Sequence, residues 1–322
     1  MVQRRQHLWL RRLVQLRVVQ FEQLWRRFLL RRRVLVMTTT PATTRLPMPS
    51  GVGIGWRQEI APLLAGMPDL RWVEVVAEGV MHGMPPALRR LRDDGVTVIP
   101  HGVRLGLGDA EGLDAHRIAH FADAARITRA PLVSEHIAFV RSGGVEAGHL
   151  LPLPRTREAA DVMVANVKRV QAELDVPIAL EPIAAVFTWP EDELTEAQFV
   201  TEIVERTDAM LLLDIANVYA NARNHGWDAL EQARAMPLER LAYMHVAGGV
   251  ENEGIYHDTH AHRVEPEVLA LIAELSTHTQ LPAAMLERDG NYPPASELLG
   301  ELDAIADAAR MPRVSTQVSV GV

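Results

Sequence analysis

The stretch GIYHDTHAHR, residues 254–263, gathers four side chains that bind metals in proteins: His257, Asp258, His260 and His262. Imidazole and carboxylate groups in one short segment indicate a metal site, although a solvated polar loop can have the same composition. The stretch alone does not separate these two interpretations. The metal-site interpretation is favoured if other histidines and carboxylates lie where the fold would bring them to this stretch.

Composition limits the chemistry of any such site. No cysteine occurs in the 322 residues, which excludes disulfides, thiolate ligands and a cysteine nucleophile. A metal must therefore be held by imidazole and carboxylate groups, a donor set that suits iron, manganese or zinc. The formal net charge of -8 argues against nucleic acid as a partner. Hydrophobic residues make up 48% of the chain, enough for a sizeable core.

Residues 1–36 differ from the rest of the chain, because they contain ten arginines and a single acid, Glu22. They include no apolar run long enough for a membrane span or a signal-peptide core, so we expect a cytoplasmic protein. A basic amphipathic helix on a membrane surface is one interpretation. We favour the other, in which translation starts at Met37 and residues 1–36 are not part of the native protein. Residues 37–50 are then a flexible linker, and 311–322 a C-terminal tail.

Eight short apolar runs follow, separated by amphipathic segments such as TREAADVMVANVKRVQAEL. Strands that alternate with helices predict parallel βαβ units, and eight units predict a single-domain α/β fold, the (β/α)8 TIM barrel, over 51–310. A doubly wound open sheet is the alternative, but GVGIGW is a poor match to a dinucleotide-binding turn. The predicted strands are 51–56, 71–78, 96–103, 130–136, 177–183, 209–218, 241–248 and 282–289.

The third to eighth runs each end near a side chain that can bind a metal. The carboxyl ends of barrel strands converge on one mouth, and the opening stretch lies in the loop after the seventh run. Each residue also has a plain structural interpretation: Asp214 could cap a helix, and Glu287 could pair with Arg288. Buried together, with no lysine in any run, the carboxylates need cations nearby. The candidate ligands are His101, His136, Glu181, Asp214, His245, Glu287, Asp258 and His260.

The mouth offers more ligands than one ion needs. Glu181 can bridge two sets, of which one adds His101 and His136 and the other adds Asp214, His245 and Glu287. Asp258 and His260 can close on a third ion.

Seven motifs resemble the multinuclear non-haem iron-dependent oxidative enzymes, a family long classed as a domain of unknown function. The resemblance covers about residues 50–305 and implies a TIM barrel with two or three iron ions in mixed Fe(II)/Fe(III) states. It implies O2-dependent modification of a ribosomally made peptide, at cysteine or another side chain, and the eight ligands named above. It also implies that Glu135 orients an imidazole and that Asn217 and Arg288 contact a ligand or the substrate. The motifs are HGVRLGLG, VSEHIAF, HLLPLPRT, LLLDIANVYANARNHG, HVAGG, HDTHAH and MLERDGNYP.

Two positions depart from the family pattern. Many members read EN where this chain has Glu181–Pro182, so we expect no side-chain amide beside Glu181. Many also carry a histidine soon after the first strand, where this chain reads GWRQEI. Neither change removes a ligand, but both bear on the substrate pocket.

The expected function is therefore peptide modification during natural-product biosynthesis. Its expected partner is a precursor peptide, recognised either by a groove at the barrel mouth or by a separate protein that binds the leader sequence. Two other classes remain open: a divalent-metal hydrolase or isomerase of the xylose isomerase-like type, and a non-catalytic metal-binding component of a modification complex.

Overall fold

Eight parallel strands close into a barrel in the computed structural model, which describes residues 45–314. Their order around the barrel is β1-β12-β9-β8-β7-β4-β3-β2, so only the β1–β12 contact joins the two ends of the sequence. This confirms the predicted (β/α)8 fold. The barrel strands are β1 (Gly51–Gly55), β2 (Trp72–Val76), β3 (Thr97–Gly102), β4 (Val133–His136), β7 (Ile178–Glu181), β8 (Met210–Asp214), β9 (Leu241–Val246) and β12 (Ala283–Leu286).

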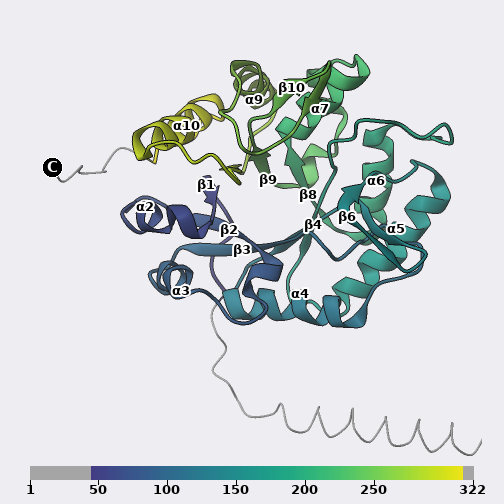
Figure 1. Ribbon diagram of the computed structural model, residues 1–322, viewed down its shortest axis with the longest axis horizontal. Coiled ribbons are helices and arrows are strands. Elements are labelled where there is room, and N and C mark those ends of the chain that lie inside the picture. Colours follow the sequence, from purple (N-terminus) through teal and green to yellow (C-terminus); the bar gives the residue numbers. More distant parts are fainter. Residues whose placement is uncertain (1–44, 315–322) are drawn as a thin grey trace, which may run out of the picture. The chain divides into compact units, whose positions relative to one another are not determined.

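Helices surround the strands, as Figure 1 shows. Short 3-10 turns supplement them at η1 (Gln58–Ile60), η2 (Ala77–Val80) and η3 (Leu238–Arg240). No helix in the described range is long and apolar enough to cross a membrane. The α-helices are α2 (Ala61–Ala65), α3 (Pro86–Asp93), α4 (Ala115–Thr128), α5 (Arg157–Gln171), α6 (Glu196–Thr207), α7 (Ile215–His225), α8 (Ala229–Ala235), α9 (Pro266–His278) and α10 (Ala295–Ala308).

Each predicted run contains a strand, and the differences lie at the run ends. The largest concerns 209–218: β8 ends at Asp214 and α7 begins at Ile215. The cause is helix capping, since the Asp214 carboxylate accepts hydrogen bonds from the backbone N–H groups of Ala216 and Asn217. The interpretation of Asp214 as a helix cap is thus confirmed, and the strand prediction for residues 215–218 was wrong.

Two antiparallel hairpins were not predicted. One joins β5 (Phe139–Ser142) to β6 (Val145–Leu151) after β4, and the other joins β10 (Val250–Asn252) to β11 (Ile255–His257) after β9. Both follow the carboxyl end of a barrel strand, so both belong to the loops around the barrel mouth.

The barrel interior is a packed core. Its buried side chains come mostly from the barrel strands, and a fully buried aliphatic or aromatic side chain contributes roughly 1.5–3 kcal/mol to folding. A second, larger apolar layer fills the space between strands and helices. The strand ends are therefore held rigidly from both sides. The interior set is Trp72, Ile99, Leu132, Ala179, Leu212, Ala242, Tyr243, Ala283 and Met285.

The predicted terminal segments lie mostly outside the described residues: 1–36, 37–44 of the linker, and 315–322 of the tail. The remaining linker residues contact the barrel. Thr97 donates a hydrogen bond from its hydroxyl to the Pro47 carbonyl at 3.0 Å, and Leu46 N–H donates to the Arg129 carbonyl at 3.2 Å. Residues 45–50 are thus attached to the barrel rather than free.

Candidate metal centre

The ligand candidates on strands form one layer at the barrel mouth. Successive strand residues point to opposite faces, so a residue two positions after an interior residue also points inward. His101 follows Ile99 in this way, and Glu181 follows Ala179. The same spacing holds along the other strands, and all six side chains are buried. The six are His101, His136, Glu181, Asp214, His245 and Glu287.

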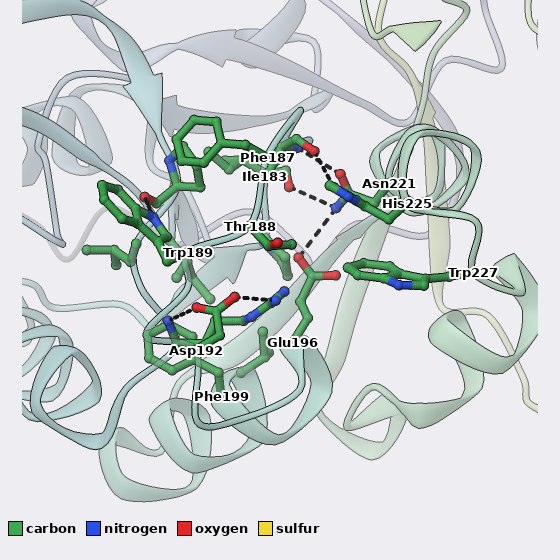
Figure 2. Close-up of a pocket in the computed structure, with 17 residues that line it drawn as sticks. Ile183, Phe187, Thr188, Trp189, Asp192, Glu196, Phe199, Asn221, His225 and Trp227 are labelled. Atoms are coloured by element: carbon green, nitrogen blue, oxygen red, sulfur yellow. Dashed lines mark hydrogen bonds and ion pairs between the residues drawn. The ribbon is translucent and has the colours of Figure 1, made fainter. Parts of the chain in front are cut away.

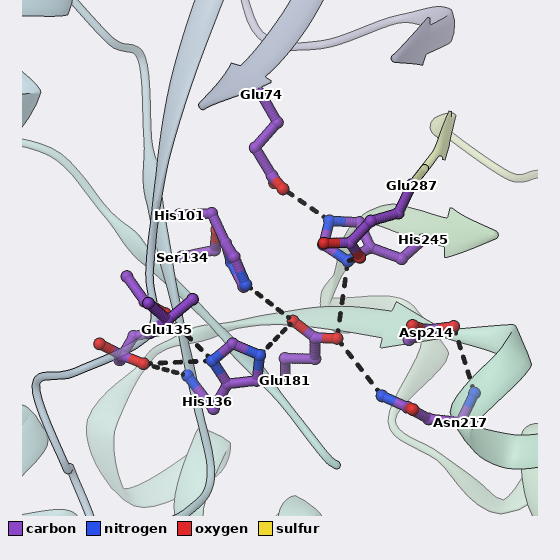
Figure 3. Close-up of polar contacts among 12 residues, drawn as sticks. Glu74, His101, Ser134, Glu135, His136, Glu181, Asp214, Asn217, His245 and Glu287 are labelled. Atoms are coloured by element: carbon purple, nitrogen blue, oxygen red, sulfur yellow. Dashed lines mark hydrogen bonds and ion pairs between the residues drawn. The ribbon is translucent and has the colours of Figure 1, made fainter. Parts of the chain in front are cut away.

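Glu181 stands between two groups of imidazoles (Figure 3). Its Oε2 atom lies 3.5 Å from Nε2 of His101 and 3.5 Å from Nε2 of His136. Its Oε1 atom lies 3.5 Å from Nδ1 of His245. Ligand atoms of Glu181, Asp214 and His245 also fall within 4.8 Å of one another, as do those of His101, His136 and Glu181. The two carboxylate oxygens therefore face two different groups of donors.

The opening stretch contributes two of its four residues to this mouth. His260 Nε2 bonds to Asp258 Oδ2 and lies 3.9 Å from Asp214 Oδ2, and its Nδ1 lies 3.6 Å from Glu287 Oε1. Asp214, His260 and Glu287 form a further group of donors. His257 is exposed in β11, and His262 Nδ1 bonds to the Thr259 hydroxyl at 2.7 Å.

The HVAGG motif brings this loop close to the strand. A Cβ atom at Gly248 would lie 2.2 Å from the carbonyl oxygen of Arg263, so only glycine permits the backbone approach. His260 itself has a φ angle of 51°, in the left-handed region. The loop ligands are thus positioned by backbone packing rather than by a strand.

The His136 ring is oriented by contacts at Nδ1, the ring nitrogen that faces away from Glu181. Its Nδ1 lies 3.0 Å from the Gly102 carbonyl and 3.2 Å from Glu135 Oε1, which are both acceptors. Nδ1 must therefore carry a proton, which leaves Nε2 facing Glu181 as the nitrogen that a metal could bind. Glu135 also accepts from the backbone N–H of Leu105, and a Cβ atom at Gly102 would lie 2.4 Å from Glu135 Oε2. The position of Glu135 agrees with the orienting role inferred from the sequence.

A second buried network orients His101 and His245. Its other members, Glu74, Ser134 and Tyr243, were not predicted. His101 Nδ1 lies 2.9 Å from the Ser134 hydroxyl, which lies 2.7 Å from the Tyr243 hydroxyl. Tyr243 in turn lies 2.6 Å from Glu74 Oε2. Because a phenol has one proton, Tyr243 donates it to the carboxylate, Ser134 donates to Tyr243, and His101 donates to Ser134.

Glu74 completes this network on the other side. His245 Nε2 lies 3.1 Å from Glu74 Oε2, which leaves Nδ1 of His245 to face Glu181 and Glu287. Ligand atoms of Glu74, His245 and Glu287 are also close enough to share an ion. The signal was present in the sequence: Glu74 is the acid inside the run RWVEVVAE, two residues after the interior Trp72.

Opposing charges set the pKa values in the cluster. Burial favours the neutral acid, but His136 and His245 outweigh it and lower the pKa of Glu181 to about 2. Burial also opposes the charged form of His136, yet the carboxylates of Glu181 and Glu135 raise its pKa to about 9. At Asp214, burial and then the charges of Asp258 and Glu181 raise the pKa to about 8. Without a cation, the cluster holds protons on some of its groups.

The donor set fits metal cations. Three buried carboxylate oxygens of the cluster accept no hydrogen bond from any described residue: Glu181 Oε2, Asp214 Oδ2 and Asp258 Oδ1. His245 Nδ1, by contrast, lies 2.9 Å from Glu287 Oε2. Buried polar atoms are normally paired, so three unpaired oxygens in one cluster need an explanation. A cation between them would satisfy them together, and imidazole with carboxylate suits iron, manganese or zinc.

The other predicted contact residues differ in their placement. Asn217 donates from Nδ2 to the Pro182 carbonyl at 3.2 Å and to Glu181 Oε1 at 3.4 Å. The expectation that Glu181 has no amide beside it was therefore wrong, because α7 supplies one. Arg288 is buried and pairs with Glu301 of α10 at 2.6 Å, so the Glu287–Arg288 ion pair weighed as an alternative does not account for this guanidinium.

One further cation lies at the edge of the cluster. In the GWRQEI segment, Arg57 Nη2 lies 3.9 Å from Glu287 Oε1 and pairs with Asp289.

A family model described as "RiPP precursor modification enzyme MbnB/TglH/ChrH" matches residues 51–310. A UPF0276 protein of Streptomyces avermitilis is 51% identical over 263 residues, which are 79% of this chain and 54% of that protein. A UPF0276 protein of Caulobacter vibrioides is 34% identical over 257 residues, 79% of this chain and 92% of that protein. The chain thus spans about half of the Streptomyces relative but nearly all of the Caulobacter one.

Solved structures with the same fold are much more distant in sequence. A D-tagatose 3-epimerase-like protein has a TM-score of 0.55 at 13% identity, covering 80% of this chain and 98% of that one. Endonuclease IV from Thermus thermophilus has a TM-score of 0.53 at 15% identity, covering 82% and 99%. At such identities the likeness establishes the barrel fold alone.

Proposed function

Because this chain belongs to the MbnB/TglH/ChrH family of RiPP precursor modification enzymes, we propose that it is an iron-dependent, O2-using oxidoreductase. Its substrate would be a ribosomally synthesised precursor peptide, modified at cysteine or another side chain in the cytoplasm. A separate protein would bind the leader sequence of that peptide. The observation that carries the proposal is the set of three buried carboxylate oxygens, on Glu181, Asp214 and Asp258, that accept no hydrogen bond from the described residues.

The candidate ligands divide into three sets, each of which would bind one ion. His101, His136 and one oxygen of Glu181 would hold the first ion. The other oxygen of Glu181 with Asp214 and His245 would hold the second. Asp258 and His260, beside Glu287, would hold a third. When bound, iron would supply electron transfer with O2 and Lewis acidity toward an anionic group of the peptide.

The protein contributes orientation and exclusion of water. Glu135 and Gly102 keep the proton of His136 on Nδ1, and Glu74 keeps that of His245 on Nε2, so neither ring needs to reorient before it binds an ion. The strand-end ligands are buried, which shields the reacting groups from solvent. The loop that carries His260 is partly exposed, unlike the strand-end ligands.

The proposal is tested on protein purified without added metal under anaerobic conditions. We expect two or three irons per chain by elemental analysis, and O2 consumption that depends on a candidate precursor peptide from a neighbouring reading frame. A mass change in that peptide should accompany the consumption. Zinc as the resident metal in a colourless protein would favour the hydrolase alternative, and full iron with no O2 consumption for any neighbouring peptide would favour a binding component.

A further inference from the structure

A pocket with aromatic walls opens next to the metal centre (Figure 2). It lies between the β7–α6 connection, α7 and the segment after β6, and its cavity volume is about 50 Å³. Trp189 is fixed by a hydrogen bond from its Nε1 to the Pro152 carbonyl at 2.9 Å, and its ring packs edge-on against Phe187. Trp227 stacks on His225 with ring centroids 4.6 Å apart.

The pocket shares its wall with the cluster. Ile137 lines the pocket and directly follows His136. Pro182 and Ile183 line it and directly follow Glu181. A residue bound in the pocket is therefore only a few residues of extended chain from a group held at the irons.

Three side chains determine the charge of the pocket. Arg155 pairs with Asp192 at 2.5 Å, so these two charges balance. Glu196, at the start of α6, has only a long contact, 3.4 Å from Oε1 to Asn221 Nδ2. Burial raises the pKa of Glu196 to about 7, because the nearby guanidinium of Arg155 only partly offsets the loss of solvation. The pocket thus holds one carboxylate without a cation of its own.

The surroundings of Glu196 suit an organic cation. Figure 2 shows its carboxylate turned toward the Trp227 ring. An aromatic face and a carboxylate together attract a guanidinium or ammonium group, whose alkyl stem can lie along apolar side chains such as Ile183 and Phe199. The guanidinium of Arg155 already lies over the Trp227 ring in this way, with its Cζ atom 5.9 Å from the ring centroid.

We propose that this pocket binds an arginine or lysine side chain of the substrate peptide, with Glu196 as the counter-ion and Trp227 as the stacking surface. The identity of the ligand as part of a peptide rests on the proposed function, whereas the preference for a cation rests on the pocket alone. Glu196 is then a specificity residue that fixes which part of the peptide lies over the metal centre.

The test measures binding of blocked amino acids to the full-length protein as purified, with its metal content recorded. The probes are Nα-acetyl-arginine amide and Nα-acetyl-lysine amide, with the norleucine and phenylalanine amides as neutral comparisons, followed by tryptophan fluorescence. We expect saturable binding of both cationic probes and at least tenfold weaker binding of the neutral ones. Trp227→Phe should remove most of the fluorescence change.

Glu196→Gln should weaken binding of the arginine probe about tenfold or more, because the amide cannot form the charge-assisted bond that the carboxylate forms. Glu193→Gln is the matched control, because Glu193 is an exposed residue of the same connection, and it should bind normally. Equal binding of the norleucine or phenylalanine probe, unchanged binding in Glu196→Gln, or no saturable binding would each overturn the proposal.

A pH series gives a second measurement that does not depend on the yield of a variant. Binding of the arginine probe should weaken from pH 8 to pH 5.5 as Glu196 takes up a proton. Arg155, Asp192 and His225 are the other charged or titratable groups that line the pocket. Glu196→Gln should flatten the profile, and a profile unchanged in that variant would contradict the assignment. Binding needs neither iron nor O2, so its outcome is separable from that of the proposed function.

Discussion

Glu181, which is buried, and Glu196, which is half-buried, are carboxyl groups at the two ends of one connection, yet their surroundings move their pKa values in opposite directions. Glu181 ends β7 among imidazoles, and its pKa is lowered to about 2. Glu196 begins α6 beside aromatic rings, and its pKa is raised to about 7. Both lose solvation on burial, so the difference comes from the partners that each carboxylate faces.

The comparison distinguishes two kinds of site built around a carboxylate. Around Glu181 the partners are imidazoles, and those of His136 and His245 are each oriented by a hydrogen bond on the other ring nitrogen, an arrangement that suits metal ions. Around Glu196 the partners are the Asn221 amide, the Arg155 guanidinium and an aromatic lining, which suit an organic cation better than a metal ion. One connection thus borders both the proposed reaction centre and the proposed recognition pocket.

The largest expected effect follows from removing the charge of Glu181. Glu181→Gln should lose two irons per chain, because both oxygens of this carboxylate face separate groups of imidazoles. Elemental analysis of the purified variant measures the loss. Glu196→Gln, at the other end of the connection, should keep full iron. Loss of a single iron in Glu181→Gln would mean that Glu181 does not bridge.

A smaller loss is expected at the loop. Asp258→Ala with His260→Ala should lower iron by about one ion per chain and leave the strand-end sites filled, since a loop ligand pair is less rigidly held. In the unaltered protein the same ion should be the first removed by a chelator. His257→Ala with His262→Ala is the matched control, and it should keep its iron because these rings point to solvent or to Thr259. Metal loss in the control alone would show that the wrong pair was assigned.

Periodicity made most of the barrel predictable. Strand runs and intervening amphipathic segments identified all eight strands, and strand ends identified the layer of ligand candidates. The error at β8 arose because LLLDIANV is apolar on both sides of Asp214, so hydrophobicity does not separate strand from helix there. Only the capping oxygen of Asp214 marks the boundary.

The remaining omissions have a different physical cause. Glu74 could have been found by the rule that found His101, because it lies two residues after an inward-facing Trp72. The Ser134–Tyr243 contact could not, because it joins strands on opposite sides of the barrel and depends on the packing of its interior. The position of Asn217 beside Glu181 likewise depends on how α7 leaves β8.

An intermediate effect is expected for Glu74→Gln, which keeps the shape of the side chain. The amide can no longer act as the charged acceptor for both Tyr243 and His245. Iron stoichiometry should stay full at saturating metal, but affinity should fall about 10- to 100-fold, the usual consequence of losing a group that orients a ligand. Competition with a chelator of known affinity measures this. Loss of a whole ion at saturating iron would instead identify Glu74 as a ligand.

The smallest effect concerns the free energy of unfolding of metal-free protein, which ionisation of Glu181 should raise and ionisation of Glu196 should lower. The pKa of Glu181 is lower in the folded chain than the ordinary 4.5, so its ionised form stabilises the fold above pH 4.5 and the benefit is lost as pH falls toward 2. The pKa of Glu196 is raised, so its ionisation costs stability as pH rises from 4.5 through 7.

Glu181→Gln should therefore be less stable than the unaltered protein at both pH 5 and pH 8, while Glu196→Gln should gain relative stability from pH 5 to pH 8. Each difference should be no more than about 3 kcal/mol, since one pKa unit corresponds to about 1.4 kcal/mol. Urea unfolding of chelator-treated protein at the two pH values measures both. Glu193→Gln, an exposed carboxyl group on the same connection, should show no such pH dependence. If both buried variants changed stability in the same direction between pH 5 and pH 8, burial alone, and not the facing groups, would govern these carboxylates.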